Sequence, residues 1–159
     1  MSATLYHIAL VTHIIGLTMM AGTTFVDFVI TKHFWKQFAN DKLKAIAINQ
    51  TVSKFPMLFG IGIMLLILSG ITMMYLTNGA FGEQTWFRIK FGLVIAIIIN
   101  GLAVGRRQAI KLKTLLFAET AAENREAAFS RVKTNINWFH ISQITMFIVI
   151  FILSAFKFN

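Results

Sequence analysis

The sequence predicts an all-α integral membrane protein, a single four-helix transmembrane bundle over residues 1–159 with helices extending into the cytoplasm. The chain is 57% hydrophobic and 13% charged, with a mean hydropathy of +0.71, and is far more apolar than a soluble domain. It also holds four long apolar segments, at about residues 8–30, 55–76, 86–104 and 138–156. Each is close to the ~20 residues that a helix needs to cross ~30 Å of hydrocarbon.

The first segment, residues 8–30, is expected to remain as a membrane helix. It is longer than the apolar core of a secretory signal peptide, and it lacks the basic start and the small-residue cleavage site of one. After it, Asn40 and Asp41 can cap a helix over residues 42–52. The single proline, Pro56, opens the second span, where its missing N–H costs least.

The third span is expected to continue beyond the membrane. Over residues 106–118 basic residues alternate with leucine and isoleucine, a pattern that favours an amphipathic helix lying near the lipid headgroups. Before the fourth span, Thr120 and Glu123 have the spacing of a capping box for a helix ending near Lys133. The helices should therefore be longer than the membrane is thick.

The basic residues predict the orientation of the bundle. Fifteen Lys and Arg outnumber six Asp and Glu, which gives a formal charge of +9. The first and third connections are basic, whereas the middle loop, residues 77–85, has no Lys or Arg. The positive-inside rule therefore places the basic connections in the cytoplasm and both termini outside, in what we expect to be the bacterial cytoplasmic (inner) membrane. Nucleic-acid binding is the rival interpretation of this charge, but basic flanks are common beside membrane helices, so the expected partner is membrane lipid.

The chain has no cysteine. Disulfides, thiolate chemistry, iron–sulfur clusters and covalently attached c-type haem are therefore excluded. Any metal or cofactor must be held by histidine, methionine, carboxylate or backbone groups.

Two of the spans carry a polar stripe that should face the inside of the bundle. Residues seven apart nearly superpose on a helix, so each stripe marks one face. The stripe of the first span holds His13, Met20 and Asp27, and that of the fourth holds His140, Phe147 and Ser154, with Gln143 one turn along. A carboxyl group buried in a membrane helix needs a cation, a hydrogen-bond donor or a proton, so Asp27 should have a partner inside the bundle.

Four histidines are candidate ligands of a metal ion or a haem: His7, His13, His33 and His140. His7 and His13 are six residues apart, so their rings project about 120° and about 9 Å apart and cannot bind one metal ion together. His13 is the deepest along the first span and is the best candidate for an axial haem ligand, with Met20 or another methionine as a second ligand. His140 with His33 could form an inner pair. The alternative for His7 and His33 is that they are interfacial anchors.

Arg88 and Lys90 open the third span, where two cations oppose the helix dipole. One explanation is that both side chains extend to lipid phosphates. The other is that one turns inward to pair with an anionic ligand such as a haem propionate or a tetrapyrrole carboxylate, and we favour Lys90 for that role.

The order of these features resembles a known family. His13 is followed by Met19-Met20-Ala21-Gly22, Phe55-Pro56-Met57 opens the second span, and Trp86-Phe87-Arg88-Ile89-Lys90 opens the third. This order resembles the small four-helix haem-binding membrane proteins that include the flavin-free bacterial protoporphyrinogen oxidase and the membrane domain of copper resistance protein D. The resemblance implies b-type haem on His13 and a tetrapyrrole site assisted by Lys90. Val26-Asp27 stands where the oxidase pattern has Pro-Arg, which leaves the substrate open.

We therefore expect a membrane b-type haem protein that transfers electrons or oxidises a membrane-soluble substrate, a porphyrinogen or a quinone. In this hypothesis Lys90 is the candidate catalytic residue, His13 and His140 are the candidate metal ligands, and His7, Met20 and Arg88 are further candidate cofactor contacts. One alternative is a copper- or metal-handling protein, because thioethers suit Cu(I) and the chain has eight methionines. Another is a non-catalytic assembly subunit whose polar residues join helices. The sequence leaves open whether the protein is an enzyme and whether it forms a homodimer.

Overall fold

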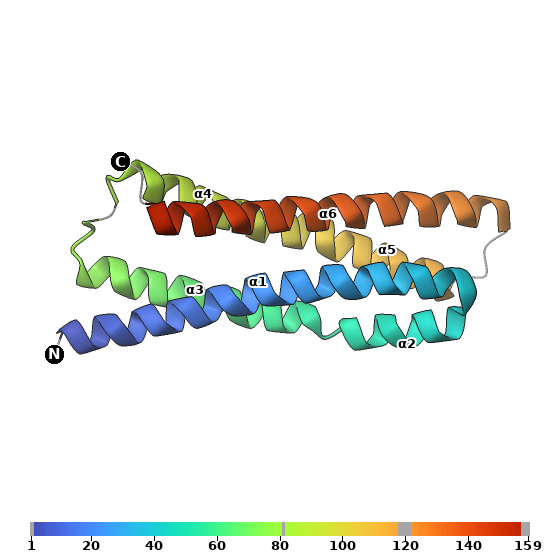
Figure 1. The fold of residues 1–159 in the computed structure, drawn as a ribbon, viewed down its shortest axis with the longest axis horizontal. Helices are drawn as coiled ribbons and strands as arrows, with labels where there is room; N and C mark the ends of the chain where they lie inside the picture. The colour runs from blue at the N-terminus through green and yellow to red at the C-terminus, as the bar shows by residue number, and fades with distance from the viewer. Residues whose placement is uncertain (1, 81, 118–121, 157–159) are drawn as a thin grey trace.

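The structure is a computed structural model that describes residues 2–80, 82–117 and 122–156. In chain order its helices are α1 (Ser2–Asn40), α2 (Lys42–Val52), α3 (Phe55–Leu76), α4 (Thr85–Asn100), the π-helical segment η1 (Gly101–Gly105), α5 (Arg106–Phe117) and α6 (Ala122–Phe156) (Figure 1). The described residues contain no β-strand. The all-α fold class is confirmed.

Four helical stretches of the described residues are long and apolar enough to cross a membrane: Ala3–Asn40, Lys42–Leu76, Thr85–Phe117 and Arg125–Phe156. Each contains one of the four spans expected from the sequence and is longer than that span. Helix α1 has 39 residues, which is about 58 Å at 1.5 Å per residue, against ~30 Å of hydrocarbon. The expectation of helices longer than the membrane is thick is confirmed.

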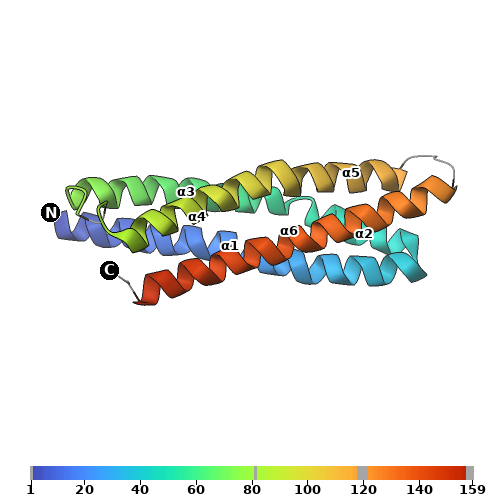
Figure 2. The same cartoon turned by 90° about the horizontal axis from the view of Figure 1, so that it is seen from above.

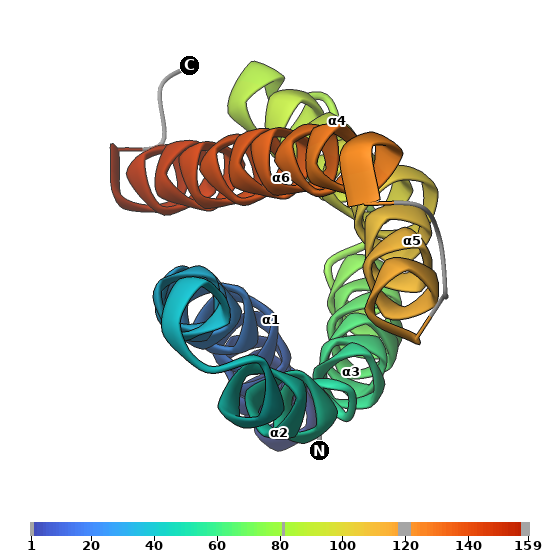
Figure 3. The ribbon, with the colours of Figure 1, turned by 90° about the vertical axis from the view of Figure 1, so that its right-hand side faces the viewer.

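The long helical stretches run back and forth along one axis. Helix α1 lies beside α2 and α3, and α6 lies beside α4 and α5 (Figure 1 and Figure 2). Seen along the axis, the helices form an open arc in which α1 and α6 are the two ends and face each other (Figure 3). Side-chain hydrogen bonds between α1 and α6 join the two ends of this arc.

Two apolar clusters hold the bundle together. The central cluster draws on all four spans, with Met20 from α1, Leu66 from α3, Ile97 from α4, and Phe147 and Ile150 from α6. The second cluster lies toward the α1–α2 corner and is formed by Phe34, Ala45, Leu112, Leu116, Phe129, Val132 and Ile136. The helix extensions thus have an apolar core of their own.

Helix α5 continues the third span beyond residue 104, as predicted. Its place near the headgroups stays a prediction, and in the structure α5 runs along α6 and continues the bundle (Figure 1). Its Leu112 and Leu116 are buried in the second cluster against Phe34 and Phe129. The extensions of α1 and α6 offer this apolar face a close-packed partner, which a headgroup layer cannot provide.

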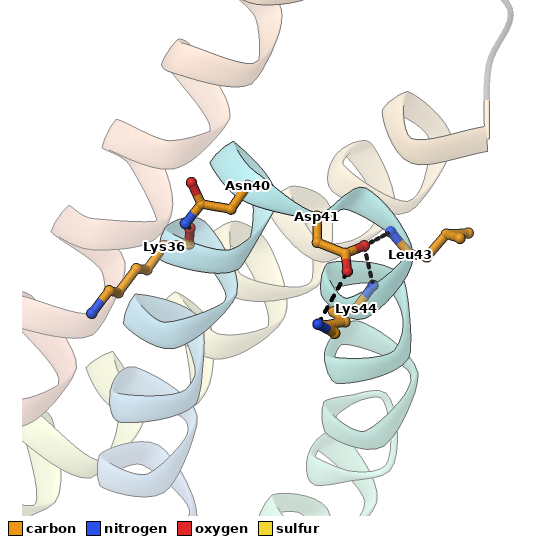
Figure 4. A network of polar contacts seen from close by, with 5 residues as sticks. All are labelled: Lys36, Asn40, Asp41, Leu43 and Lys44. Atoms are coloured by element: carbon orange, nitrogen blue, oxygen red, sulfur yellow. Dashed lines mark hydrogen bonds and ion pairs between the residues drawn. The ribbon is translucent and has the colours of Figure 1, made fainter.

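Asp41 begins α2, as predicted. Its Oδ1 accepts hydrogen bonds from the N–H groups of Leu43 at 3.0 Å and Lys44 at 3.2 Å, and its Oδ2 lies 3.4 Å from the Lys44 Nζ (Figure 4). Asn40 does not share this role, because its side-chain amide donates to the Lys36 carbonyl within α1. Thr120 lies outside the described residues, so the capping box with Glu123 stays a prediction. The expected end of this helix near Lys133 is wrong, because α6 runs without a break from Ala122 to Phe156.

Replacing Asp41 with alanine is expected to loosen the first turn of α2. The pKa of the Asp41 carboxyl lies below its usual value of 3.8, chiefly because the carboxylate accepts the Lys44 N–H hydrogen bond. This contribution to stability is present above the unfolded-state pKa and is lost as the pH falls through the lower folded-state value. At neutral pH, the backbone amides in the first turn of α2 should exchange faster in Asp41→Ala than in the wild type. The wild type should lose its protection there only in acid. Asp41→Asn keeps an acceptor oxygen and should retain protection without the acid dependence; equal exchange in all three proteins at neutral pH would contradict this account.

Candidate functional site

A polar layer lies between the central cluster and the end of the bundle where α1 begins and α6 ends (Figure 1). His13 of α1 and Ser69 of α3 meet there, with 3.0 Å between the His13 Nδ1 and the Ser69 Oγ. Lys90 of α4 is close enough for its charge to act on the His13 ring. His13 and Ser69 therefore join two spans in this layer, and Lys90, the other residue that the resemblance singled out, comes from a third span nearby.

The hydrogen bonds of Ser69 determine the sense of its contact with His13. The Ser69 hydroxyl donates to the Leu65 carbonyl at 2.6 Å, with the Leu66 carbonyl at 3.2 Å. A hydroxyl has one hydrogen and a carbonyl only accepts, so the Ser69 Oγ must accept from His13. The neutral His13 ring therefore carries its proton on Nδ1 and its lone pair on Nε2.

Glycines bring α1 and α3 close together beside this layer. A Cβ on Gly16 would lie 2.8 Å from the Leu66 backbone nitrogen and 2.9 Å from the Gly62 carbonyl oxygen. Because any side chain at Gly16 would push the helices apart, glycine is required for the crossing. The crossing is one turn from both His13 and Ser69, and it holds these two side chains within hydrogen-bonding distance.

A second polar contact joins α1 and α6 on the other side of the central cluster. The His140 Nε2 lies 2.9 Å from the Asp27 Oδ2, and the His140 and Asp27 side chains are 2% and 27% exposed. The edge of the Phe28 ring packs against His140. Asp27 therefore has the inward partner that its position in a membrane helix requires.

A third polar contact joins α4 to α6 where η1 begins. The Asn100 Nδ2 donates to the Ser142 Oγ at 3.0 Å and to the Gln143 Oε1 at 3.1 Å. Gln143 is fully buried and its Nε2 donates to the Ile97 carbonyl. This contact joins the side-chain amides of two membrane helices.

Residues 7–158 match the family of predicted integral membrane proteins called DUF2269. The chain belongs to this family. The match covers nearly the whole sequence and, with the four long apolar helices, shows a multi-pass integral membrane protein. No curated protein and no solved structure matches the chain. Haem binding and the likeness to protoporphyrinogen oxidase or copper resistance protein D are not addressed by the match and rest on the residues alone.

The structure places the other candidate ligands of this DUF2269 protein away from the His13 layer. His7 is exposed and packs edge-on against Tyr6. Met20 is 1% exposed and packs in the central cluster against Gly62, two turns from His13. These positions make His7 a surface residue and Met20 a packing residue of the fold.

Arg88 and His140 are also separate from that layer. Arg88 is exposed and its Nε donates to the Gly82 carbonyl, which closes the loop before α4. The expected inner pair of His140 with His33 is wrong, because His140 contacts Asp27 and His33 is exposed. Within the described ranges no three His, Asp or Glu side chains converge to hold a metal ion.

Ser69 is the site residue of this DUF2269 chain that sequence reasoning missed. It is the only serine of residues 55–76, and a hydroxyl in an apolar span was the available signal. That signal is weak, because serine in a membrane helix commonly bonds to its own backbone, as Ser69 also does. Only the packing of α1 on α3 shows that it also meets His13.

Proposed function

We propose that this chain is a b-type haem protein of a bacterial cytoplasmic membrane that transfers electrons or oxidises a membrane-soluble substrate, a porphyrinogen or a quinone. The observation that carries the proposal is the hydrogen bond between His13 and Ser69. This bond assigns the proton of the His13 ring to Nδ1, so that Nε2, with its lone pair, is the ligating atom.

This arrangement fits an axial haem ligand for a physical reason. A histidine that ligates a metal generally donates its other ring N–H to a neighbouring acceptor, which fixes the tautomer and orientation of the ring. Ser69 is such an acceptor, and it is itself held by the Leu65 carbonyl. Residue 70 is glycine, and a Cβ there would lie 3.4 Å from the His13 Cε1, so α3 approaches the ring closely.

Lys90 is suited to bind the anionic propionates of the haem. Haem carries propionate carboxylates, and charge-assisted hydrogen bonds from a lysine ammonium to a carboxylate are among the strong ones. Lys90 is half-buried, and it is close enough for its charge to act on the His13 ring. Arg88 is exposed and faces the loop, which leaves Lys90 as the cation for this role.

In the proposed function each protein group has one task. Bound haem supplies reversible one-electron chemistry at iron, whose potential depends on the axial ligand and on burial. His13 binds the iron, Ser69 orients His13, and Lys90 binds a carboxylate of the haem or of a tetrapyrrole substrate. His7, His33 and His140 lie outside this layer, so the proposal uses one protein ligand.

The test is the haem content of the protein made in a haem-sufficient host and purified in detergent. The wild type is expected to show a Soret band and about one b-type haem per chain by the pyridine haemochrome assay, and His13→Ala should lose both. Ser69→Ala should retain the fold and bind haem about 10–100-fold more weakly, the usual effect of removing a partner behind a ligating histidine. Anaerobic reduction of the haem by a quinol or a porphyrinogen then tests the redox function.

His33→Ala is the matched control, because His33 is an exposed histidine on the same helix. It should leave the Soret band unchanged. A colourless wild type after reconstitution with haem, or a full Soret band in His13→Ala, would overturn haem binding at this layer. A haem that neither donor reduces would overturn the redox function and leave only binding.

A further inference from the structure

A basic groove of about 660 Å³ lies between α1 and α6, on the opposite side of the central cluster from His13. Three lysines line it, two from α1 and one from α6, together with two aromatic rings and an amide: Lys32, Lys36, Lys133, Phe28, Trp35 and Asn137. Among the described residues no Asp or Glu lines it. Its lining residues come from α1 and α6, the two helices that face each other across the open side of the arc (Figure 3).

Two of the three ammonium groups are held in place on the groove walls. The Lys32 Nζ donates to the Asn137 Oδ1 at 2.7 Å and lies 5.3 Å from the centre of the Phe28 ring. The Lys133 Nζ lies 5.9 Å from the centre of the Trp35 ring. An ammonium has three donors, so Lys32 keeps further N–H groups beyond the one given to Asn137. The groove therefore presents positioned donors and positive charge.

The charge in the groove calls for an anion. Lys32 and Lys36 are one turn apart on α1, and like charges at this spacing repel each other. Lys133 adds a third positive charge from the facing helix. An anion with several oxygens would accept hydrogen bonds from more than one of these ammonium groups. Phosphate esters have this chemistry.

We propose that this groove binds the phosphate-bearing head group of an anionic membrane lipid. A lipid is favoured over a free phosphate ester because the surface beside the groove is apolar. Phe25 of α1 and Ile141 of α6 lie one turn toward the membrane centre from Phe28 and Asn137, and they are 58% and 42% exposed. A cationic groove that continues into exposed apolar side chains matches a charged head group followed by acyl chains.

The predicted orientation agrees with this ligand. The positive-inside rule places this half of the bundle toward the cytoplasm, where the membrane leaflet carries anionic lipid. A volume of about 660 Å³ is large enough for a head group.

The test compares lipid binding by the full chain in detergent, measured by native mass spectrometry. Phosphatidylglycerol and phosphatidylcholine with identical acyl chains are titrated separately, and phosphatidylglycerol is expected to bind more tightly. Substituting glutamine for Lys32, Lys36 and Lys133 should weaken the binding of phosphatidylglycerol about fivefold per lysine, hence about 100-fold together. The binding of phosphatidylcholine should be unchanged. The same three positions changed to arginine should keep the preference.

The matched control removes three positive charges outside the groove. Lys42, Lys54 and Lys113 are exposed and do not line it, so their triple glutamine variant should bind phosphatidylglycerol like the wild type. An equal loss in this variant would show that total charge decides binding and would overturn the site. Equal affinity for the two lipids would do the same. Glycerol 3-phosphate and inorganic phosphate are added as competitors, and displacement of the lipid at equal concentration would make the ligand a free phosphate and overturn the lipid assignment.

Discussion

Gly16→Leu is expected to separate α1 from α3 and to break the His13–Ser69 hydrogen bond. A Cβ at Gly16 would lie 2.8 Å and 2.9 Å from two backbone atoms of α3, and backbone atoms cannot turn aside as a flexible side chain can. Overpacking of this kind typically costs about 1–3 kcal/mol. Because a whole leucine side chain must be accommodated, we expect the free energy of unfolding to fall by about 3 kcal/mol, and Gly16→Ala should show the lower part of the range.

The loss should appear in two independent measurements. Unfolding in detergent with increasing dodecyl sulfate should give a lower free energy for Gly16→Leu, and the haem content should fall with it if His13 is the ligand. Gly60 and Gly92 are the matched controls, since a Cβ at either one would meet no atom within 4 Å. Leucine at these positions should change neither quantity. A Gly16→Leu protein as stable as its controls would mean that α1 and α3 do not cross as closely as described.

The four membrane helices could be predicted because the signal for a span is local. About twenty apolar residues in a row favour a membrane helix whatever the rest of the chain does. The start of α2 was equally local, because the Asp41 carboxylate caps residues two and three positions away. The position of α5, in contrast, was determined by parts of the chain far from it in sequence. Its leucines could face lipid headgroups or another helix, and the extensions of α1 and α6 decided between these.

The inward faces of the first and fourth spans could also be predicted, since helix geometry alone fixes which residues share a face. Met20 of the first stripe and His140 and Phe147 of the second are buried. Their partners could not be predicted. Ser69 is 56 residues from His13, and Asp27 is 113 residues from His140. Such pairs depend on how far one span is shifted along the next, and no property of a single helix contains that shift.

The π-helical turn η1 was missed for a similar reason. Gly101 and Gly105 mark its ends. A Cβ at Gly105 would lie 2.7 Å from the Phe139 ring of α6. The turn therefore lies where the Phe139 ring of α6 packs against the backbone, and this contact depends on packing between helices.

Separating the Asp27–His140 pair should destabilise the bundle more when the histidine is removed than when the aspartate is removed. His140→Leu leaves an aspartate in a membrane helix without this partner. An aspartate costs about 3 kcal/mol at the centre of a membrane helix. Asp27 is partly exposed and near the end of the span expected at residues 8–30, so we expect about 2 kcal/mol. Asp27→Leu leaves a buried imidazole N–H or lone pair without its partner, which costs about 1–2 kcal/mol.

The double variant Asp27→Leu, His140→Leu should cost less than the two single changes together, because neither polar group is then left behind. The free energies of unfolding of the four proteins form a double-mutant cycle, and we expect a coupling of about 1–2 kcal/mol. Lys32 and Asn137 supply the control, since they join the same two helices by an exposed hydrogen bond of 2.7 Å. Their cycle should give less than about 0.5 kcal/mol. A stronger coupling for the exposed pair than for Asp27 and His140 would contradict the idea that burial makes the α1–α6 contact stable. The contact would then depend on the exposed hydrogen bond of Lys32 instead.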